Sequence, residues 1–180
     1  GAGFYVNATT DKWSENFQMW DYITIELPKL IFENFPLLKN AQGITGHSMG
    51  GHGALTMAMT LPDQYQSVSA FAPIGNPTKS EWGQKQFKEY LGEDTTTWEK
   101  HDSTILMQKV GFHSNVLIDQ GNADNFLDLL QPVSLKNAMN TRGQDGQFRI
   151  SNGYDHSYFF VMSFMREHIE HHATILNVID

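Results

Sequence analysis

The 180-residue chain has no cysteine, no cluster of basic residues and no long hydrophobic run. The lack of cysteine excludes a disulfide framework and a cysteine nucleophile, and it is compatible with a reducing compartment. No apolar stretch approaches the roughly 18 residues that span a bilayer, and the first residues lack the basic and apolar segments of a secretory signal. We therefore expect a soluble, cytoplasmic protein with no membrane partner.

The charge balance is acidic. Twenty Asp and Glu residues against 12 Lys and Arg give a formal net charge of -8 at pH 7. Such a chain does not attract phosphate backbones, so nucleic acid is not an expected partner. The length is that of one ordinary domain, and a hydrophobic content of 40% fits a globular core. We treat residues 1–180 as a single domain.

Strand and helix patterns alternate along the chain. Short apolar runs predict buried strands at 42–47, 67–73, 115–121 and 147–151. Apolar residues at helical spacing predict helices at 12–35, 49–61, 125–139 and 158–176. Pro28 should bend the first helix or end its first half, and residues 74–110 form an irregular excursion with short helical patterns. This alternation predicts an α/β fold, a mostly parallel sheet with helices on both faces.

The segment Gly-His-Ser-Met-Gly, residues 46–50, lies where a strand is predicted to give way to a helix. A serine on such a sharp turn is typical of a nucleophile elbow, which needs small residues two positions before and after it. Gly46 and Gly50 provide that clearance, and Gly51 lets the helix approach the sheet. The amide of Met49 would then face a developing oxyanion at the helix N-terminus. The alternative is that Ser48 is only a structural turn residue.

A serine nucleophile needs a histidine base that is oriented by a carboxylate. In this fold the chain order is serine, acid, histidine, with the last two on loops after later strands. Asp124 follows the strand 115–121 and His156 follows the strand 147–151, so we predict these two residues as acid and base. The competing acids are Asp119, inside a strand, Asp128, in a helix, and Asp155, next to the histidine.

The other histidines have simpler interpretations. We expect His47 and His52 to be packing residues. His168 and His172 are four positions apart in the run Glu-His-Ile-Glu-His-His, residues 167–172, but the run lacks the H-E-x-x-H order of zinc enzymes and a third ligand. We therefore predict an exposed polar helix face there, and neither a catalytic metal nor a cofactor.

Several motifs in the same order resemble one known family. The segments "GHSMGGHGAL", "SVSAFAPIGNP", "WGQKQFKEYLG", "LIDQGNADNFL" and "GYDHSYFF" are similar to those of the S-formylglutathione hydrolases, the esterase D family of the α/β-hydrolase fold. The resemblance covers essentially the whole chain. It implies a serine thioesterase that hydrolyses S-formylglutathione to formate and glutathione, with side activity on short esters. The triad of the family falls on Ser48, Asp124 and His156, and because members are often dimers, a homodimer is one open assembly.

The small formyl group calls for a walled acyl site. Trp82, in the excursion 74–110, is a candidate for lining that pocket or the pocket of the thiol. Ordinary packing of the excursion is the alternative.

The chain resembles only the C-terminal two-thirds of that family's domain. Only 47 residues precede Ser48, too few for the N-terminal strands of the family, and the second oxyanion donor lies in that part. If these residues were the whole molecule, the sheet would have an unpaired edge and the chain would be unstable or nearly inactive. Two other functions remain open, a general short-chain carboxylesterase or acyltransferase and an inactive truncated binding domain.

Overall fold

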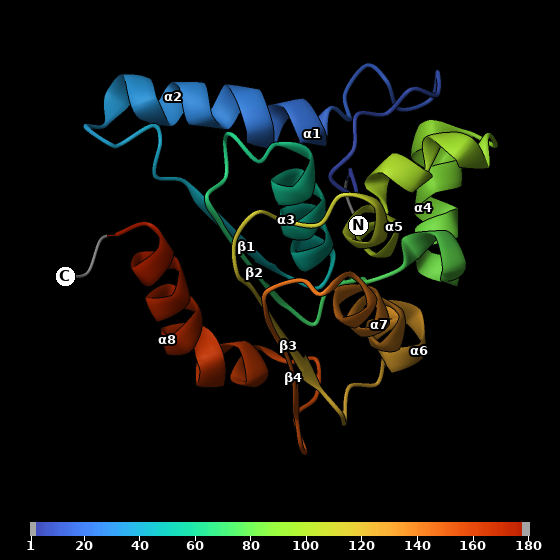
Figure 1. Ribbon diagram of the computed structural model, residues 1–180. Coiled ribbons are helices and arrows are strands. Elements are labelled where there is room, and N and C mark those ends of the chain that lie inside the picture. Colours follow the sequence, from blue (N-terminus) through green and yellow to red (C-terminus); the bar gives the residue numbers. More distant parts are fainter. Residues whose placement is uncertain (1–2, 178–180) are drawn as a thin grey trace.

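A four-stranded parallel sheet forms the centre of the computed structural model, which describes residues 3–177 (Figure 1). The strands are β1 (Gly43–His47), β2 (Ser67–Phe71), β3 (Val116–Gly121) and β4 (Gly146–Ser151), and they lie side by side in chain order. In register, Ile44 lies beside Val68, and Val68 beside Val116. All four predicted strands are confirmed. Their carboxyl ends meet at one edge of the sheet, where the predicted nucleophile, acid and base follow β1, β3 and β4.

Helices cover both faces of the sheet, as predicted. Helix α3 (Met49–Thr60) packs on β1 and β2 and against α5 (Ser103–Lys109), which contacts α7 (Pro132–Arg142). On the other face, α8 (Tyr158–Ile175) packs on β2 and β3 (Figure 1). Side chains alternate along β2, so that Val68 and Ala70 join the core under α3 while Ser67, Ser69 and Phe71 contact α8.

Residues 12–18 do not form the start of a helix, contrary to the prediction of a helix from residue 12 to 35. Residues 12–16 form turns, Gln18 pairs with Asn7 in an isolated β-bridge, and helical structure begins only with α1 (Met19–Asp21). The apolar residues of this stretch serve tertiary contacts instead. Trp13 and Phe17 pack edge-on to each other, and both contact Tyr90 of α4 (Glu81–Leu91). Helical spacing in the sequence therefore reflected packing on another helix rather than a continuous helix.

Pro28 does not end the helical segment. A π-helical turn, η1 (Tyr22–Glu26), leads directly into α2 (Leu27–Asn34). The amide of Leu27 donates to the carbonyl of Tyr22, five residues earlier. Proline has no amide proton, so it is tolerated at the beginning of α2, where the hydrogen-bond pattern changes from π to α.

The predicted helix over residues 125–139 is interrupted. The structure has α6 (Leu127–Leu130) and then α7, separated by Gln131 in a left-handed conformation at φ 56°. Pro132 disfavours helical geometry in the residue before it, which explains the break. Within the excursion 74–110, α4 and α5 accompany three short 3-10 turns: η2 (Pro77–Lys79), η3 (Thr95–Thr97) and η4 (Glu99–His101).

The histidines of α8 face the sheet, so the predicted exposed polar face is wrong. His168 is 1% exposed, and its ring stacks on Phe71 with centroids 3.7 Å apart. His172 makes hydrogen bonds of 2.7 Å and 2.8 Å to the hydroxyls of Ser67 and Ser69. The sequence signal that was missed is the serine at alternate positions of an apolar strand, because buried hydroxyls need partners from the covering helix.

A network of polar and charged side chains joins β3, β4 and α8, with Asp119 and His168 buried, Arg149 half-buried and Glu167 exposed. Arg149 Nε donates to Asp119 Oδ1 at 2.6 Å, a second guanidinium nitrogen contacts Asp119 Oδ2, and a third contacts Glu167. Nε2 of His168 lies 2.9 Å from Asp119 Oδ2. Burial acts to raise the pKa of Asp119, but the hydrogen bonds from His168 and Arg149 outweigh it and hold this pKa below its usual value. Asp119 is therefore a structural anion, as expected from its place inside a strand.

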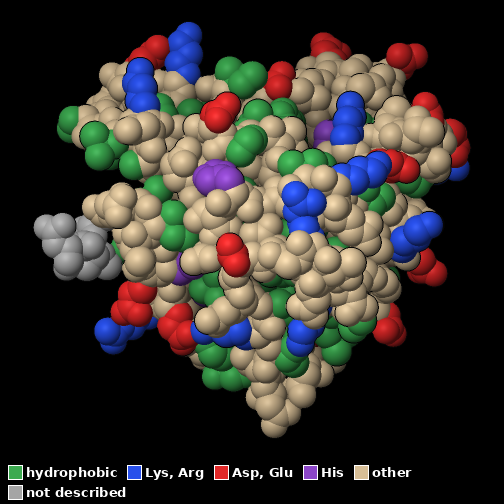
Figure 2. Space-filling model, viewed as in Figure 1, with side chains coloured by type: hydrophobic (Ala, Val, Ile, Leu, Met, Phe, Trp, Pro, Cys, Tyr) green, Lys and Arg blue, Asp and Glu red, His purple; other side chains and the backbone are tan. Residues whose placement is uncertain are grey.

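Strand β1 has one neighbour in the described sheet and therefore lies at its edge. Beside it is an apolar groove of about 530 Å³ between β1 and α2, lined by residues that include Leu27, Ile31, Phe32 and Ile44. On the face shown in Figure 2, hydrophobic side chains are visible over α2, and Lys and Arg are scattered rather than gathered in a patch. No helix within residues 3–177 combines the length and the apolar character needed to cross a membrane.

One buried and three half-buried histidines make folding sensitive to acid. Burial, as the main cause, lowers the pKa of each from 6.5 to about 3 or 4. They are His47, His52, His101 and His172. Between pH 6.5 and 4 the unfolded chain therefore binds protons that the folded chain does not. Stability is thus fully present above pH 6.5 and falls as the pH drops below it.

We expect unfolding at pH 5 to take up protons at these four histidines, so the midpoint of urea denaturation should fall steadily between pH 7 and 4.5. Tryptophan fluorescence would follow the transition. His101→Gln should make the dependence on pH shallower than in the parent chain, and His113→Gln, at an exposed histidine, is the matched control. Equal midpoints at pH 7 and pH 5 would contradict the neutral state of these side chains.

Candidate active site

Ser48 occupies a strained turn between β1 and α3. Its backbone has φ 59° and ψ -117°, a conformation that a non-glycine residue adopts only when its surroundings enforce it. Its amide donates to the carbonyl of Phe71 at 2.8 Å, and its own carbonyl accepts from the amides of His52 and Ile74. Three backbone hydrogen bonds thus hold the turn, so the sharp strand-to-helix turn predicted at Ser48 is present in the structure.

The glycines around this turn differ in how strictly they are needed. A Cβ at Gly46 would lie 2.2 Å from the carbonyl oxygen of Gly50, and one at Gly51 would lie 3.1 Å from that of Gly46. A Cβ at Gly50 would meet only the hydroxyl of Tyr5, at 3.5 Å, which is an ordinary contact. The prediction that both flanking glycines provide steric clearance is therefore right for Gly46 and wrong for Gly50.

Asp124 and His156 are in direct contact. Oδ2 of Asp124 lies 2.7 Å from Nδ1 of His156. The carboxylate is 4% exposed and also accepts hydrogen bonds from the side-chain amide of Gln120 at 3.0 Å and the backbone amide of Phe126 at 2.8 Å. Burial acts to raise the pKa of Asp124, but these hydrogen bonds, with that of His156 the strongest, hold the pKa below its usual value. The ionised carboxylate selects the tautomer of His156 that carries its proton on Nδ1.

The loops after β3 and β4 are joined along their length, which brings these two side chains together. Asn122 donates its side-chain amide to Asn152 at 2.9 Å and accepts from the amide of Gly153 at 2.8 Å. The amide of Ala123 donates to the carbonyl of Tyr154. A Cβ at position 121 would lie only 2.2 Å from that carbonyl oxygen, so a glycine is required at this crossing. The segment "GNAD" indicated a tight turn after β3, but the sequence did not show which loop packs against it.

The other two predicted acids have different surroundings. Asp155 is exposed and accepts from the amide of Ser157 at 3.0 Å, near the start of α8. Asp128 lies on α6 and is exposed. Within residues 3–177, Asp124 is thus the acid that contacts His156.

A cleft of about 510 Å³ adjoins the turn, and its lining includes Tyr5, His47, Ser48, Met49 and Tyr158. Met49 is the first residue of α3, so its amide lies at the positive end of the helix dipole. Within residues 3–177 the structure shows no hydrogen bond between the Ser48 hydroxyl and His156. Catalytic hydrogen bonds of this kind tighten when substrate is bound.

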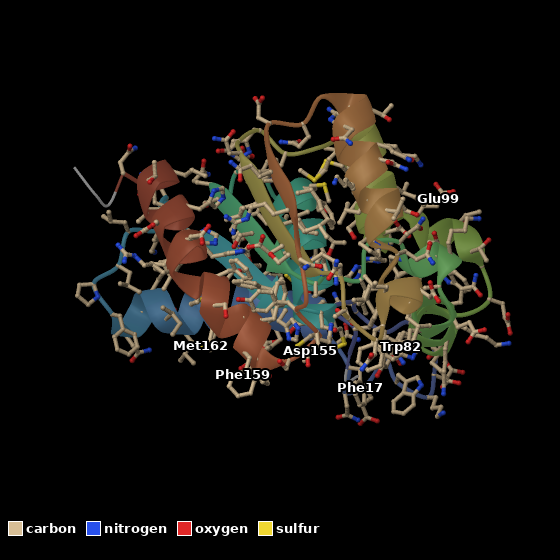
Figure 3. The ribbon with its side chains drawn as sticks, turned by 90° about the horizontal axis from the view of Figure 1, so that it is seen from below. Phe17, Trp82, Glu99, Asp155, Phe159 and Met162 are labelled. Carbon is tan, nitrogen blue, oxygen red and sulfur yellow. The ribbon has the colours of Figure 1, made fainter. Side chains whose placement is uncertain are left out.

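Aromatic rings line up across the site. The ring of Trp82, 37% exposed, lies 4.9 Å from Phe126, which in turn lies 5.2 Å from His156. His47 also contacts His156, and the centroids of the two rings lie 4.5 Å apart. Trp82 therefore reaches His156 through Phe126 rather than directly, and Figure 3 shows it on the same side of the molecule as Asp155. His47 contacts His156, whereas His52 stacks on Phe4 as an ordinary packing residue.

The described residues contain no group of three or more His, Asp or Glu side chains placed to hold a metal ion. His168 and His172, the pair weighed as ligands, are instead hydrogen-bonded to Asp119 and to two serines.

A family model described as "Putative esterase" matches residues 1–171. The chain belongs to this esterase family. The S-formylglutathione hydrolase of Paracoccus denitrificans is 63% identical over 173 residues, which are 96% of this chain and 62% of that protein. The enzyme of the same name from Arabidopsis thaliana is 48% identical, over 99% of this chain and 63% of its own. The resemblance seen in the motifs is thus confirmed over almost the whole chain.

A solved S-formylglutathione hydrolase structure, from Agrobacterium tumefaciens, has the same fold. It superimposes with a TM-score of 0.93 at 42% identity, covering 97% of this chain and 63% of that protein. A serine hydrolase of Staphylococcus aureus, FphF, shares the fold alone, at 22% identity and a TM-score of 0.76. The chain spans slightly less than two thirds of the length of the S-formylglutathione hydrolases it matches.

The glycine contacts predict a contrast between two substitutions. Gly46→Ala should destabilise the chain by at least ~1–3 kcal/mol, because its Cβ would collide with the backbone of Gly50. Gly50→Ala should leave stability unchanged or raise it, since alanine favours a helix over glycine. Urea denaturation of both variants beside the parent chain gives the comparison. Equal losses of stability would show that the elbow is packed differently from this structure.

Proposed function

We propose that this chain carries the nucleophile, acid and base of a serine thioesterase that hydrolyses S-formylglutathione to formate and glutathione. The observation that carries the proposal is the contact of Asp124 with His156 at the sheet edge where the strained turn presents Ser48. The names of its relatives supply the substrate. The proposed domain is a single α/β-hydrolase domain, of which residues 1–180 would be the C-terminal two-thirds.

In the first half of the reaction, the Ser48 oxygen attacks the formyl carbon and passes its proton to Nε2 of His156. Asp124 stabilises the imidazolium that forms. The carbonyl oxygen becomes an oxyanion, for which the amide of Met49 is the proposed donor. Collapse of the tetrahedral intermediate breaks the bond to sulfur, the imidazolium of His156 gives its proton to the departing thiolate, and glutathione leaves while Ser48 keeps the formyl group.

A thiol has a pKa near ~8.5, so its expulsion in the first half needs less assistance from His156 as an acid than expulsion of an amine does. The second half returns the enzyme to its starting state. Water then gives a proton to His156 and attacks the formyl ester, and formate leaves as Ser48 recovers its proton. No metal or cofactor takes part in this scheme.

The aromatic pair beside the base is the proposed wall of the substrate pocket. Trp82 and Phe126 lie in contact, and Phe126 reaches His156. A rigid wall close to the reacting carbon would favour the formyl group over larger acyl groups. The proposed partner is thus a small thioester, and a homodimer and a cytoplasmic location complete the proposal.

Ser48→Ala should abolish covalent labelling by a fluorophosphonate. In that reaction the serine oxygen forms a bond to phosphorus, the P–F bond breaks, and the serine proton passes to His156. Intact-mass measurement detects the product directly. The control is Ser163→Ala, because this exposed serine lies on α8 and donates only to the carbonyl of Phe159. Labelling of the Ser48→Ala chain at the parent rate would remove Ser48 from the mechanism.

Substrate comparison tests the thioesterase assignment separately. We expect kcat/KM for S-formylglutathione to exceed that for p-nitrophenyl acetate, because the small acyl site and the thiol leaving group both favour the thioester. Release of free thiol and of nitrophenol can be followed under the same conditions. A ratio of one or less would assign the same triad to a general carboxylesterase.

A further inference from the structure

One ring outside the proposed mechanism lies against the proposed base. His47 is the last residue of β1, and its imidazole lies 4.5 Å from that of His156, centroid to centroid, with 38° between the ring planes. Phe126 contacts His156 with its ring nearly perpendicular, at 84° and 5.2 Å. The base is thus bounded by two rings that come from different parts of the chain.

The hydrogen bond to Asp124 does not fix His156 completely. It holds Nδ1 at one point, but the imidazole can still rotate about the line joining Nδ1 to the carboxylate oxygen. Nε2 lies off that line, so rotation would change its distance from the Ser48 oxygen. Ring contacts restrict such rotation, because a flat neighbour permits close packing in only a few orientations. A displacement of about 1 Å between reacting groups can lower a rate by about 10²-fold.

The charge state of His47 suits this position. Burial, and after it the neighbouring His156, lower the pKa of His47 to about 4, while the carboxylate of Asp124 acts in the opposite direction. The phenol of Tyr158, whose ring centroid is 5.8 Å away, is the other titratable group beside it. At neutral pH His47 is therefore an uncharged flat ring that does not repel the imidazolium formed on His156 during the reaction.

We propose that His47 is a positioning residue that, together with Phe126, holds the plane of the His156 imidazole so that Nε2 faces the Ser48 hydroxyl. This inference rests on the proposed function. It gives a role to the variable residue of the elbow motif, which the sequence alone assigned to packing.

Two variants distinguish the effect of the flat His47 ring from the effect of its volume. His47→Phe keeps a flat, uncharged ring, whereas His47→Leu keeps a similar volume without one. The first measurement needs no catalysis: ¹³C relaxation of the His156 ring in histidine-labelled chain reports its mobility. We expect greater mobility in His47→Leu and parent-like mobility in His47→Phe. Unchanged mobility in His47→Leu would overturn the inference, whether or not the chain is active.

The second measurement is the rate of fluorophosphonate reaction at increasing concentration. His47→Leu should lower the maximal rate about 10-fold with the half-saturating concentration unchanged, and His47→Phe should restore most of the rate. His113→Leu, at an exposed histidine away from the site, is the control. Equal rates in the Leu and Phe variants, or a change only in half-saturation, would overturn the role of His47. Failure of the parent chain to react would count against the proposed function instead.

Discussion

The proposed reaction centre depends on how closely the loops after β3 and β4 pass each other. Parallel pairing of these strands places both loops at one edge of the sheet, and the crossing at Gly121 leaves no space for a side chain. The hydrogen bonds of Asn122 and Ala123 to the second loop then hold the approach. Because the two loops lie this close together, Oδ2 of Asp124 can lie 2.7 Å from Nδ1 of His156. The path of the backbone thus determines which side chains can meet at the proposed reaction centre.

Polar contacts on the face of the sheet that α8 covers support the same region. Asp119 lies in β3, Arg149 in β4 and His168 in α8, and the three side chains are hydrogen-bonded together. Asp124 follows β3, and His156 lies between β4 and α8. A buried carboxylate such as Asp119 is costly unless it is paired, so its hydrogen bonds to Arg149 and His168 favour one arrangement of these elements. The end of the sheet from which the loops emerge is therefore held in place by these contacts between β3, β4 and α8.

Sequence reasoning was strongest where local chemistry has few solutions. The alternation of strands with helices, the strained turn at Ser48 and the contact of Asp124 with His156 all follow from short-range patterns in the sequence. It failed where a tertiary contact overrides a local pattern. Trp13 and Phe17 have helical spacing but pack on Tyr90 from a turn, and Pro132 divides a helix that apolar periodicity joined.

Buried polar residues were the other source of error. The histidines of α8 looked like a solvated face because their partners, Ser67, Ser69 and Asp119, lie some 50 to 100 residues away in the chain. Gly50 looked as necessary as Gly46 because a motif does not say which atoms collide. For the histidines the missing information was a set of long-range contacts, which no spacing along the sequence contains. For Gly50 it was the local path of the backbone, because the collision at Gly46 involves an oxygen only four residues away.

The most direct test of the proposed centre is a crystal structure of the chain after reaction with a fluorophosphonate. The account predicts a covalent bond from Ser48 Oγ to phosphorus, a phosphonyl oxygen within hydrogen-bond distance of the Met49 amide, and Nε2 of His156 facing the serine oxygen. Attachment to another residue, or a phosphonyl oxygen turned away from Met49 with His156 separated from the adduct, would contradict it.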